Sequence, residues 1–347
     1  AVNNPAWQAS VGDMVPRALM ARAVMLNGVS FNIARSFGPA LGGVIVAAGG
    51  AAAAFAVNAA SYVGLIAALA RWRPEAAPRR LPPEPLGVAM AAGLRYVRMS
   101  PHLLVVLRRV LLFSFAAAAA QAVMPLVARD LIGGGAITYG VLLGGFGVGA
   151  VVGGLGAAHM RRLSADRAVQ IASLAVAVGL AGTAESGSLV LTLVCLAVLG
   201  AGWVVAWSTF NVGIQLASPR WVVARALALY QVAAFGGLAA GSWAFGALAE
   251  RYGVSAALEM AAAMEVAGVL LGWRRPLPDP GGANFDPHDF REPEIALPIR
   301  PQSGPVVISI EHRVPRANVP AFLAAMAERR RIRLRDGARD WRLLRDL

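Results

Sequence analysis

The sequence predicts an all-α protein that crosses a membrane several times. Hydrophobic residues make up 57% of the 347 residues and charged residues only 15%. Soluble globular domains carry about 45–50% apolar and roughly 25% charged residues. The core of a single water-soluble domain would not bury this excess of apolar residues, so the composition favours a chain embedded in lipid.

Eight apolar runs are candidates for membrane-spanning helices, because a span needs about 20 mostly apolar residues to cross roughly 30 Å of hydrocarbon. They are residues 23–48, 51–70, 107–128, 138–158, 168–183, 187–208, 226–248 and 254–272. The run at 168–183 is short, and the first two runs meet at a turn formed by Gly49 and Gly50.

The arginines predict which side of the membrane each connector occupies. When the connectors are taken alternately, one set holds fifteen arginines and the other holds two. Cytoplasmic loops carry the excess of basic residues, so we expect the rich set and the tail after Trp273 to lie in the cytoplasm, beneath the inner (cell) membrane. The charged residues that we assign to topology or to a cytoplasmic gate are Arg17, Arg22, Arg161, Arg162, Asp166, Arg167, Arg220 and Arg225.

Several function classes are disfavoured by the charge and the rare residues. The net charge of +13 would suit nucleic acid, but the basic residues lie mostly between apolar runs, which disfavours that interpretation. The four histidines show no metal-ligand spacing with one another or with carboxylates. The one cysteine, Cys195, lies in an apolar run, where we expect it to be buried and inert. We therefore expect no nucleic-acid partner, metal or cofactor.

An internal repeat relates the two ends of the apolar region. PRALMARA at 16–23 and PRWVVARA at 219–226 share one pattern, and a shift of 203 residues matches residues 16–43 to 219–246 at nine of 28 positions. The same shift places 51–71 on 254–274. Either a common loop-to-helix boundary recurs by chance, or the chain holds two parallel repeats related by an axis along the membrane normal.

With this repeat, the chain resembles the major facilitator superfamily (MFS), in the branch of siderophore and drug exporters with a cytoplasmic C-terminal extension (transmembrane secretion effector type). The resemblance is carried by PAWQASVGDMVPRALMARAVMLNGVSFNIARSFGPALGG at 5–43, VVARALALYQVAAFGGLAAGSWAFGALAERYG at 222–253 and GPVVISIEHRVPRANVPAFLAAMAERRRIRLRDG at 304–337. It implies a non-enzymatic secondary transporter in the lipid bilayer, which exports a small organic compound by proton antiport and alternating access. It also implies twelve helices, of which about eight are present in an N-terminally truncated chain.

The resemblance divides the chain into five parts. We expect the end of a first six-helix half at 1–70, a central cytoplasmic loop at 71–106, a second six-helix half at 107–273, a linker at 274–304 and a partial β-α-β domain at 305–347. In that last domain, strands at 306–312 and 341–347 would flank a helix at 318–331, as in the ferredoxin-like domains of small monooxygenases. A membrane-anchored enzyme or regulatory module acting through this tail is the alternative function.

The central loop also contains a candidate helix. Its sequence, GVAMAAGLRYVRMSP, follows a proline-rich segment. The residues that suit the apolar face of a short interfacial helix there are Val88, Met90, Ala91, Leu94 and Val97.

The first run carries a motif and an arginine. Gly38, Pro39, Gly42 and Gly43 resemble the antiporter motif of the family's fifth helix, although Ala34 stands at its first glycine position. Asn32 and Arg35 share one helical stripe with Pro39. Arg35 either pairs with substrate or a carboxylate inside the bundle, or extends to the cytoplasmic interface.

The last run carries two carboxylates, Glu259 and Glu265, which are six residues apart and therefore lie on different helix faces. Intramembrane carboxylates are candidate functional groups, so one of them is a candidate proton or cation site. Asn58, Gln121, Trp203, Trp207 and Asn211 are candidate cavity residues. The alternative roles are helix packing for the amides and interfacial anchoring for the tryptophans.

Small residues also mark one run for close packing. Its glycines follow overlapping GxxxG steps, and they are Gly140, Gly144, Gly145, Gly149 and Gly153. We expect these glycines to let a neighbouring helix approach closely.

Overall fold

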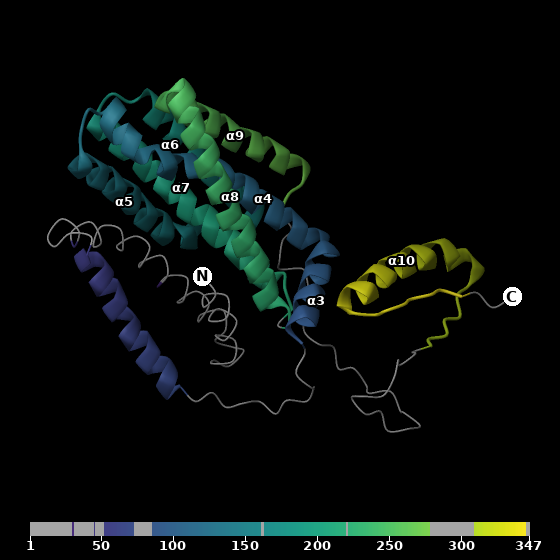
Figure 1. The fold of residues 1–347 in the computed structure, drawn as a ribbon. Coiled ribbons are helices and arrows are strands. Elements are labelled where there is room, and N and C mark those ends of the chain that lie inside the picture. Colours follow the sequence, from purple (N-terminus) through teal and green to yellow (C-terminus); the bar gives the residue numbers. More distant parts are fainter. Residues whose placement is uncertain are drawn as a thin grey trace. The chain divides into compact units, whose positions relative to one another are not determined.

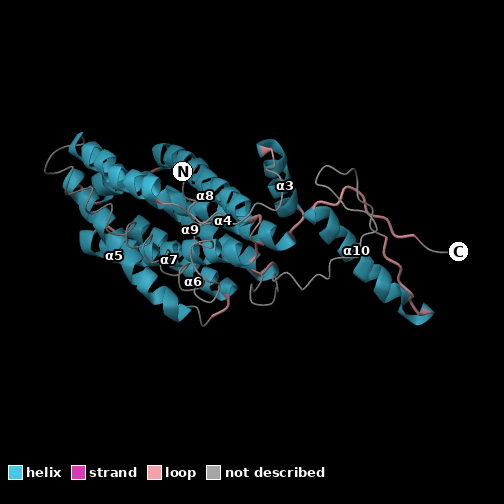
Figure 2. Cartoon of the chain, turned by 90° about the horizontal axis from the view of Figure 1, so that it is seen from below, coloured by secondary structure: helices cyan, strands magenta, loops and turns pink. Residues whose placement is uncertain are grey.

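The described residues of the chain are helical wherever they form regular structure (Figures 1 and 2). The structure is a computed structural model that describes residues 30, 45, 52–72, 85–160, 163–219, 221–277 and 309–344. The chain divides into two compact units, one of residues 1–74 with 102–283 and the other of residues 75–101 with 284–347. Each unit is considered by itself below.

Seven helices in the described ranges are long and apolar enough to cross a membrane. They are an unlabelled helix at Ala52–Arg71, then α4 (Pro101–Leu126, continued by a π-helical turn η2 at Val127–Leu131), α5 (Ala136–Met160), α6 (Ala165–Glu185), α7 (Leu189–Leu216), α8 (Val223–Tyr252) and α9 (Val254–Arg274). These seven helices confirm seven of the eight predicted runs. The run at 23–48 lies outside the described residues, apart from helical residues 30 and 45.

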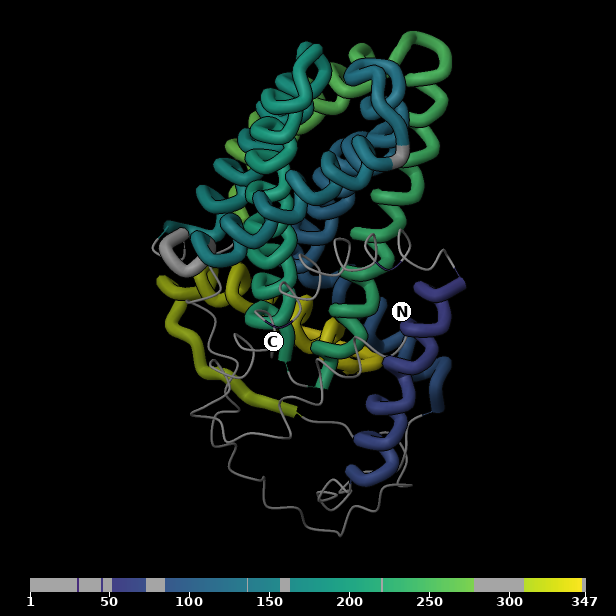
Figure 3. The backbone as a smooth tube through the Cα atoms, turned by 90° about the vertical axis from the view of Figure 1, so that its left-hand side faces the viewer, coloured from purple at the N-terminus to yellow at the C-terminus, as the bar shows by residue number. Residues whose placement is uncertain are grey.

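Helices α4 to α9 are joined by short connections and run side by side (Figure 3). A single residue, Gly253, separates α8 from α9, and its φ of 91° is a conformation that a residue with a Cβ rarely adopts. At this end of the bundle, the hydroxyl of Ser255 donates to the carbonyl of Ala184 at 2.8 Å. The α6–α7 and α8–α9 connections therefore lie together, and both belong to the arginine-poor set.

Helices α5 and α7 approach closely along a row of glycines. A Cβ added at Gly149 or Gly153 would overlap the backbone of Ala197 or Ala201 in α7, and one at Gly145 would meet Leu193. The predicted packing role is confirmed for these three glycines. No atom of the described residues outside α5 lies within 4 Å of a Cβ built at Gly140 or Gly144, so for these two glycines the packing role stays a prediction.

The second unit contains α3 (Leu86–Arg98), a 3-10 turn at Arg316–Asn318 and α10 (Val319–Asp336). The predicted helix in the central loop is confirmed, and the described residues leave four of the five side chains named for its apolar face exposed. Only Val97 of the five named residues is buried, and the other buried residues are Ala92, Gly93 and Tyr96. The apolar periodicity alone did not indicate that α10 would pack beside Tyr96.

The tail helix is present, and it extends beyond the predicted 318–331 to Asp336. The predicted strands differ from the structure, because residues 309–312 and 341–344 carry no regular structure in the described part of the tail. A β-strand requires a partner for its backbone N–H and C=O groups. Neither segment has a strand partner among the described residues.

Candidate functional site

A cluster of aromatic rings joins four helices of the bundle. At its centre, Trp203 of α7 is fully buried and stacks on Trp207, one helical turn further on, with ring centroids 5.7 Å apart and planes 13° apart. The spacing of four residues places both rings on one face of α7. The aromatic cluster consists of Phe113, Phe146, Trp203, Trp207, Phe210, Tyr230 and Phe235.

The remaining rings of the aromatic cluster come from neighbouring helices. Phe113 of α4 lies 6.1 Å from Trp203, and Phe146 of α5 lies 6.0 Å from it. On the other side, Phe235 and Tyr230 of α8 lie 5.8 Å and 6.3 Å from Trp207. The Tyr230 hydroxyl also donates to the carbonyl of Trp207 at 3.3 Å. Edge-to-face and stacked pairs at these distances are favourable, so the cluster fixes the faces of α7 and α8.

The aromatic cluster changes from buried to exposed along α7 and α8. Trp203 has no exposed surface, Trp207 is half-buried and Phe235 is 54% exposed. Trp203 lies midway between the ends of α7 at Leu189 and Leu216. The cluster is therefore at mid-depth in the bundle, with an open edge at Trp207 and Phe235.

A buried carboxylate lies at the same depth on α9. Glu265 is 2% exposed and is near the middle of the helix. The hydroxyl of Ser173, in the middle of α6, is its hydrogen-bonding partner. Its Oε1 atom has no partner among the described residues. A buried polar atom without a partner carries a desolvation cost, so Glu265 is a candidate site residue.

A third polar group lies at one end of the bundle, where Asp166 joins three segments. Its Oδ1 accepts from Arg109 in the first turns of α4 and, at 3.0 Å, from the backbone N–H of Leu277 after α9. Its Oδ2 accepts from Gln170 at 2.6 Å. The side chains of Arg109 and Asp166 are only 12% and 14% exposed, so water screens this pair weakly. These segments all belong to the connectors of the arginine-rich set.

The full sequence, residues 1–347, matches the family described as transmembrane secretion effector. The chain belongs to this family. It is a family of the MFS type, and its members are multi-pass transporters, so the resemblance inferred from the sequence is confirmed at this level. No match to a curated protein was found. Membership favours a transporter over the alternative of a membrane-anchored enzyme.

The structure places the two predicted carboxylates in different surroundings. Glu259 is exposed and faces Glu185 of α6, near the end of the bundle at Gly253. Glu265 is buried in the centre, so the two side chains lie on different faces, as their spacing predicts. Of the two, only Glu265 combines mid-depth with burial.

The other predicted site residues are dispersed. Asn58 and Gln121 are exposed, and Asn211 is bonded to Gln215 by a 2.6 Å hydrogen bond within α7. Trp207 is the one predicted cavity residue at the open edge of the aromatic cluster. The predicted residues that lie outside the described ranges are Arg17, Arg22, Asn32, Arg35, Gly38, Pro39, Gly42, Gly43, Arg161, Arg162 and Arg220.

Sequence reasoning missed most of the site's other members. Phe113 and Phe146 lie in apolar runs, where a phenylalanine carries no functional signal. Ser173 and Ser114 are buried polar residues, and the Ser114 hydroxyl has no partner among the described residues. A serine in the middle of an otherwise apolar span was the one signal available. Cys195 is half-buried and does not reach the burial predicted for it.

Proposed function

We propose that this protein exports a small, largely apolar organic compound, of the drug or siderophore type, by proton-coupled alternating access. The observation that carries the proposal is the aromatic cluster at mid-depth, which opens at Trp207 and Phe235. Transporter sites lie near the bilayer midplane, where the surrounding bundles move about them. Aromatic walls with a few polar groups suit an amphiphilic ligand.

The proposed substrate contact is the open edge of the cluster. Trp203 and Phe113 are buried and make a fixed floor, whereas Trp207 and Phe235 present ring surface that the described residues do not cover. A planar or cyclic apolar group can stack on such rings without breaking contacts inside the floor. The phenol of Tyr230 is already bonded to Trp207, so it orients the edge and does not need to contact substrate.

Glu265 is the proposed proton site. An ionised carboxylate in the middle of a bundle is costly unless it is paired. Ser173 gives it one hydrogen bond, and no cation faces it among the described residues. In the proposal Glu265 holds a proton in this arrangement of α6 and α9, and it releases that proton when the two helices separate and water enters.

The proposed movement involves the two halves that the sequence repeat predicts. In the proposal, residues 107–273 form the second half and residues 1–70 belong to the end of the first. The contacts of Asp166 join α4 and α6 of the second half to the segment after α9. In the proposal these contacts keep the cytoplasmic end of this half rigid, so that the half moves as one body about the aromatic cluster.

The test is efflux of a panel of drugs and siderophores from cells with and without the protein, followed by variants at the open edge. Loss of an aromatic contact costs about 0.5–1.5 kcal/mol, so Trp207→Ala and Phe235→Ala should weaken apparent affinity by roughly two- to tenfold. Trp243→Ala is the matched control, because Trp243 is an exposed tryptophan of α8 outside the cluster. No efflux of any compound, or equal losses in all three variants, would overturn the proposal.

A further inference from the structure

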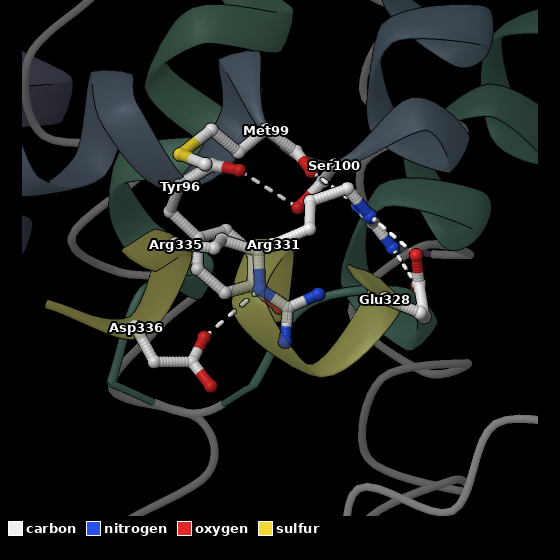
Figure 4. A network of polar contacts seen from close by, with 7 residues as sticks. All are labelled: Tyr96, Met99, Ser100, Glu328, Arg331, Arg335 and Asp336. Carbon is white, nitrogen blue, oxygen red and sulfur yellow. Dashed lines mark hydrogen bonds and ion pairs between the residues drawn. The ribbon is translucent and has the colours of Figure 1, made fainter. Parts of the chain in front are cut away.

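Helix α3 has one face that α10 covers and another that the described residues leave exposed. On the covered face, Tyr96 is 1% exposed and Arg335 of α10 lies over its ring at 4.6 Å (Figure 4). Arg331 donates to the carbonyl of Met99 and pairs with Glu328, one turn earlier on α10. These contacts fix which side of α3 belongs to the tail helix.

The open face of α3 is an apolar stripe. Leu86, Met90 and Leu94 are four residues apart, so they follow one another along a single face of the helix. Their exposed fractions are 77%, 65% and 47%. We call these three residues the outer stripe. When several large apolar side chains are exposed next to one another, their surface is typical of a site that contacts a membrane or another apolar partner.

Charged residues border the outer stripe. Arg95 and Arg98, in the last turn of α3, are both exposed, and α3 carries no acidic residue. A helix with an apolar stripe bordered by arginines is suited to the boundary between acyl chains and anionic headgroups. The helix also ends at Arg98, two residues before α4 begins at Pro101. Because α4 is a membrane span, this short connection keeps α3 close to the membrane surface.

We propose that α3 lies in the membrane interface with the outer stripe among the acyl chains, and that Arg95 and Arg98 bind anionic phospholipid headgroups. The partner is thus the lipid surface on the side where α4 begins. The α10 helix occupies the neighbouring face, so the tail reaches the membrane through α3. This inference depends on α4 spanning the membrane and does not depend on what the protein transports.

The experiment measures the depth of two adjacent positions of α3 in the whole protein reconstituted in vesicles. Cys195→Ser removes the one native thiol, and a fluorophore is attached to either Met90→Cys or Ala91→Cys. Ala91 is the matched control because it is also exposed but lies away from the outer stripe, toward the arginines. One quencher is acrylamide in the water, and the other is a nitroxide on the lipid acyl chains.

The label at Met90 should be quenched by the lipid nitroxide and be several-fold less sensitive to acrylamide than the label at Ala91. Equal quenching of both labels by acrylamide would overturn the proposal. Protection of the Met90 label from both quenchers would also overturn it, since protein would then cover the stripe. Transport is not part of the readout, so these outcomes are independent of the proposed export.

A second arm tests the headgroups. Vesicles of phosphatidylcholine alone are compared with vesicles that also contain phosphatidylglycerol. The anionic lipid should increase nitroxide quenching at Met90, and the combined Arg95→Gln and Arg98→Gln changes should remove this increase. Arg330→Gln with Arg333→Gln is the control, because both are exposed arginines of α10. An increase that survives loss of Arg95 and Arg98 would overturn the assignment of the headgroup contact.

Discussion

Arg109 and Asp166 are 57 residues apart in the sequence, and they form an ion pair that joins the beginnings of α4 and α6. Asp166 also accepts from the backbone N–H of Leu277, so one carboxylate holds together α4, α6 and the segment after α9. The pair is mostly shielded from water. Removing either charge therefore leaves the other charge without a partner, and little water can reach it to replace the lost interaction.

Replacing Asp166 with Asn should lower the free energy of unfolding by about 1–3 kcal/mol, because Arg109 keeps its charge and loses its partner. Thermal unfolding of the purified protein measures this. Asp130→Asn is the control, since Asp130 pairs on the exposed surface with its own neighbour, Arg129. That change should alter stability by less than about 1 kcal/mol. Equal losses in the two variants would contradict the structural role of Asp166.

The packing of α5 on α7 can be tested with two glycines of the same helix. Gly149→Ala places a Cβ against the carbonyl of Ala197, whereas the Cβ of Gly144→Ala meets no atom of the described residues outside α5 within 4 Å. Overpacking costs about 1–3 kcal/mol, so Gly149→Ala should lower the midpoint of thermal unfolding. Gly144→Ala should leave it unchanged or raise it slightly, because alanine favours the helix. The reverse order would show that α5 packs through another face.

Coupling is tested at Glu265 with a neutral isostere. Glu265→Gln keeps the shape of the protonated carboxyl and cannot release a proton, so it should abolish uptake driven by a pH gradient in vesicles. Exchange of substrate without a gradient should persist, since it requires no net proton movement. Glu259→Gln changes an exposed carboxylate of the same helix and should keep gradient-driven transport. Gradient-driven transport by Glu265→Gln would refute the proton site.

Docking of the tail helix depends on the ring of Tyr96 (Figure 4). Tyr96→Phe should keep α10 in place, and Tyr96→Ala should release it, because the cation–π contact requires an aromatic face. Limited proteolysis of α10 reports the difference as faster cleavage. Arg335→Gln should act like Tyr96→Ala, whereas Arg333→Gln, at an exposed position of α10, should have no effect. Equal cleavage of the Tyr96→Ala and Tyr96→Phe proteins would exclude a role for the ring.

The same contact gives a pH dependence. Burial raises the pKa of the Tyr96 phenol above its ordinary value. The positive charge of Arg335 lowers this pKa, but the effect of burial is larger. Because the pKa is raised in the docked state, the protonated phenol of Tyr96 contributes fully to the docking of α10 below its ordinary pKa of about 10. This contribution is lost as the pH rises through the raised value. Proteolysis of the tail should therefore be constant around neutral pH and increase only in strongly alkaline solution. In the Tyr96→Phe protein, this contribution to the alkaline increase should be absent.

The membrane-spanning helices could be predicted from the sequence because run length and hydropathy are local properties. The span α6 shows this, since its predicted run of 168–183 needed only small extensions at both ends. The proximity of Trp203 and Trp207 could also be inferred from the sequence, because residues four apart lie about one turn apart on the same face of a helix. These features required no knowledge of neighbouring helices.

The remaining parts of the site depend on how helices meet, and no periodicity encodes that. Phe146 and Phe113 belong to the aromatic cluster only because α5 and α4 pack beside Trp203. Asp166 and Arg109 are 57 residues apart, so their positions in the sequence do not indicate that they form an ion pair. The covered face of α3 was missed for the same reason, since the position of Arg335 on Tyr96 is set by the tail.

The one-residue connection at Gly253 has a mechanical consequence. Because one residue separates the two helices, the end of α8 at Tyr252 and the start of α9 at Val254 stay together in any movement of the bundle, and a side chain at this φ would strain the backbone. Phe235 lies on one helix of this hairpin and Glu265 on the other. The open edge of the aromatic cluster and the buried carboxylate are therefore carried by a single helical hairpin.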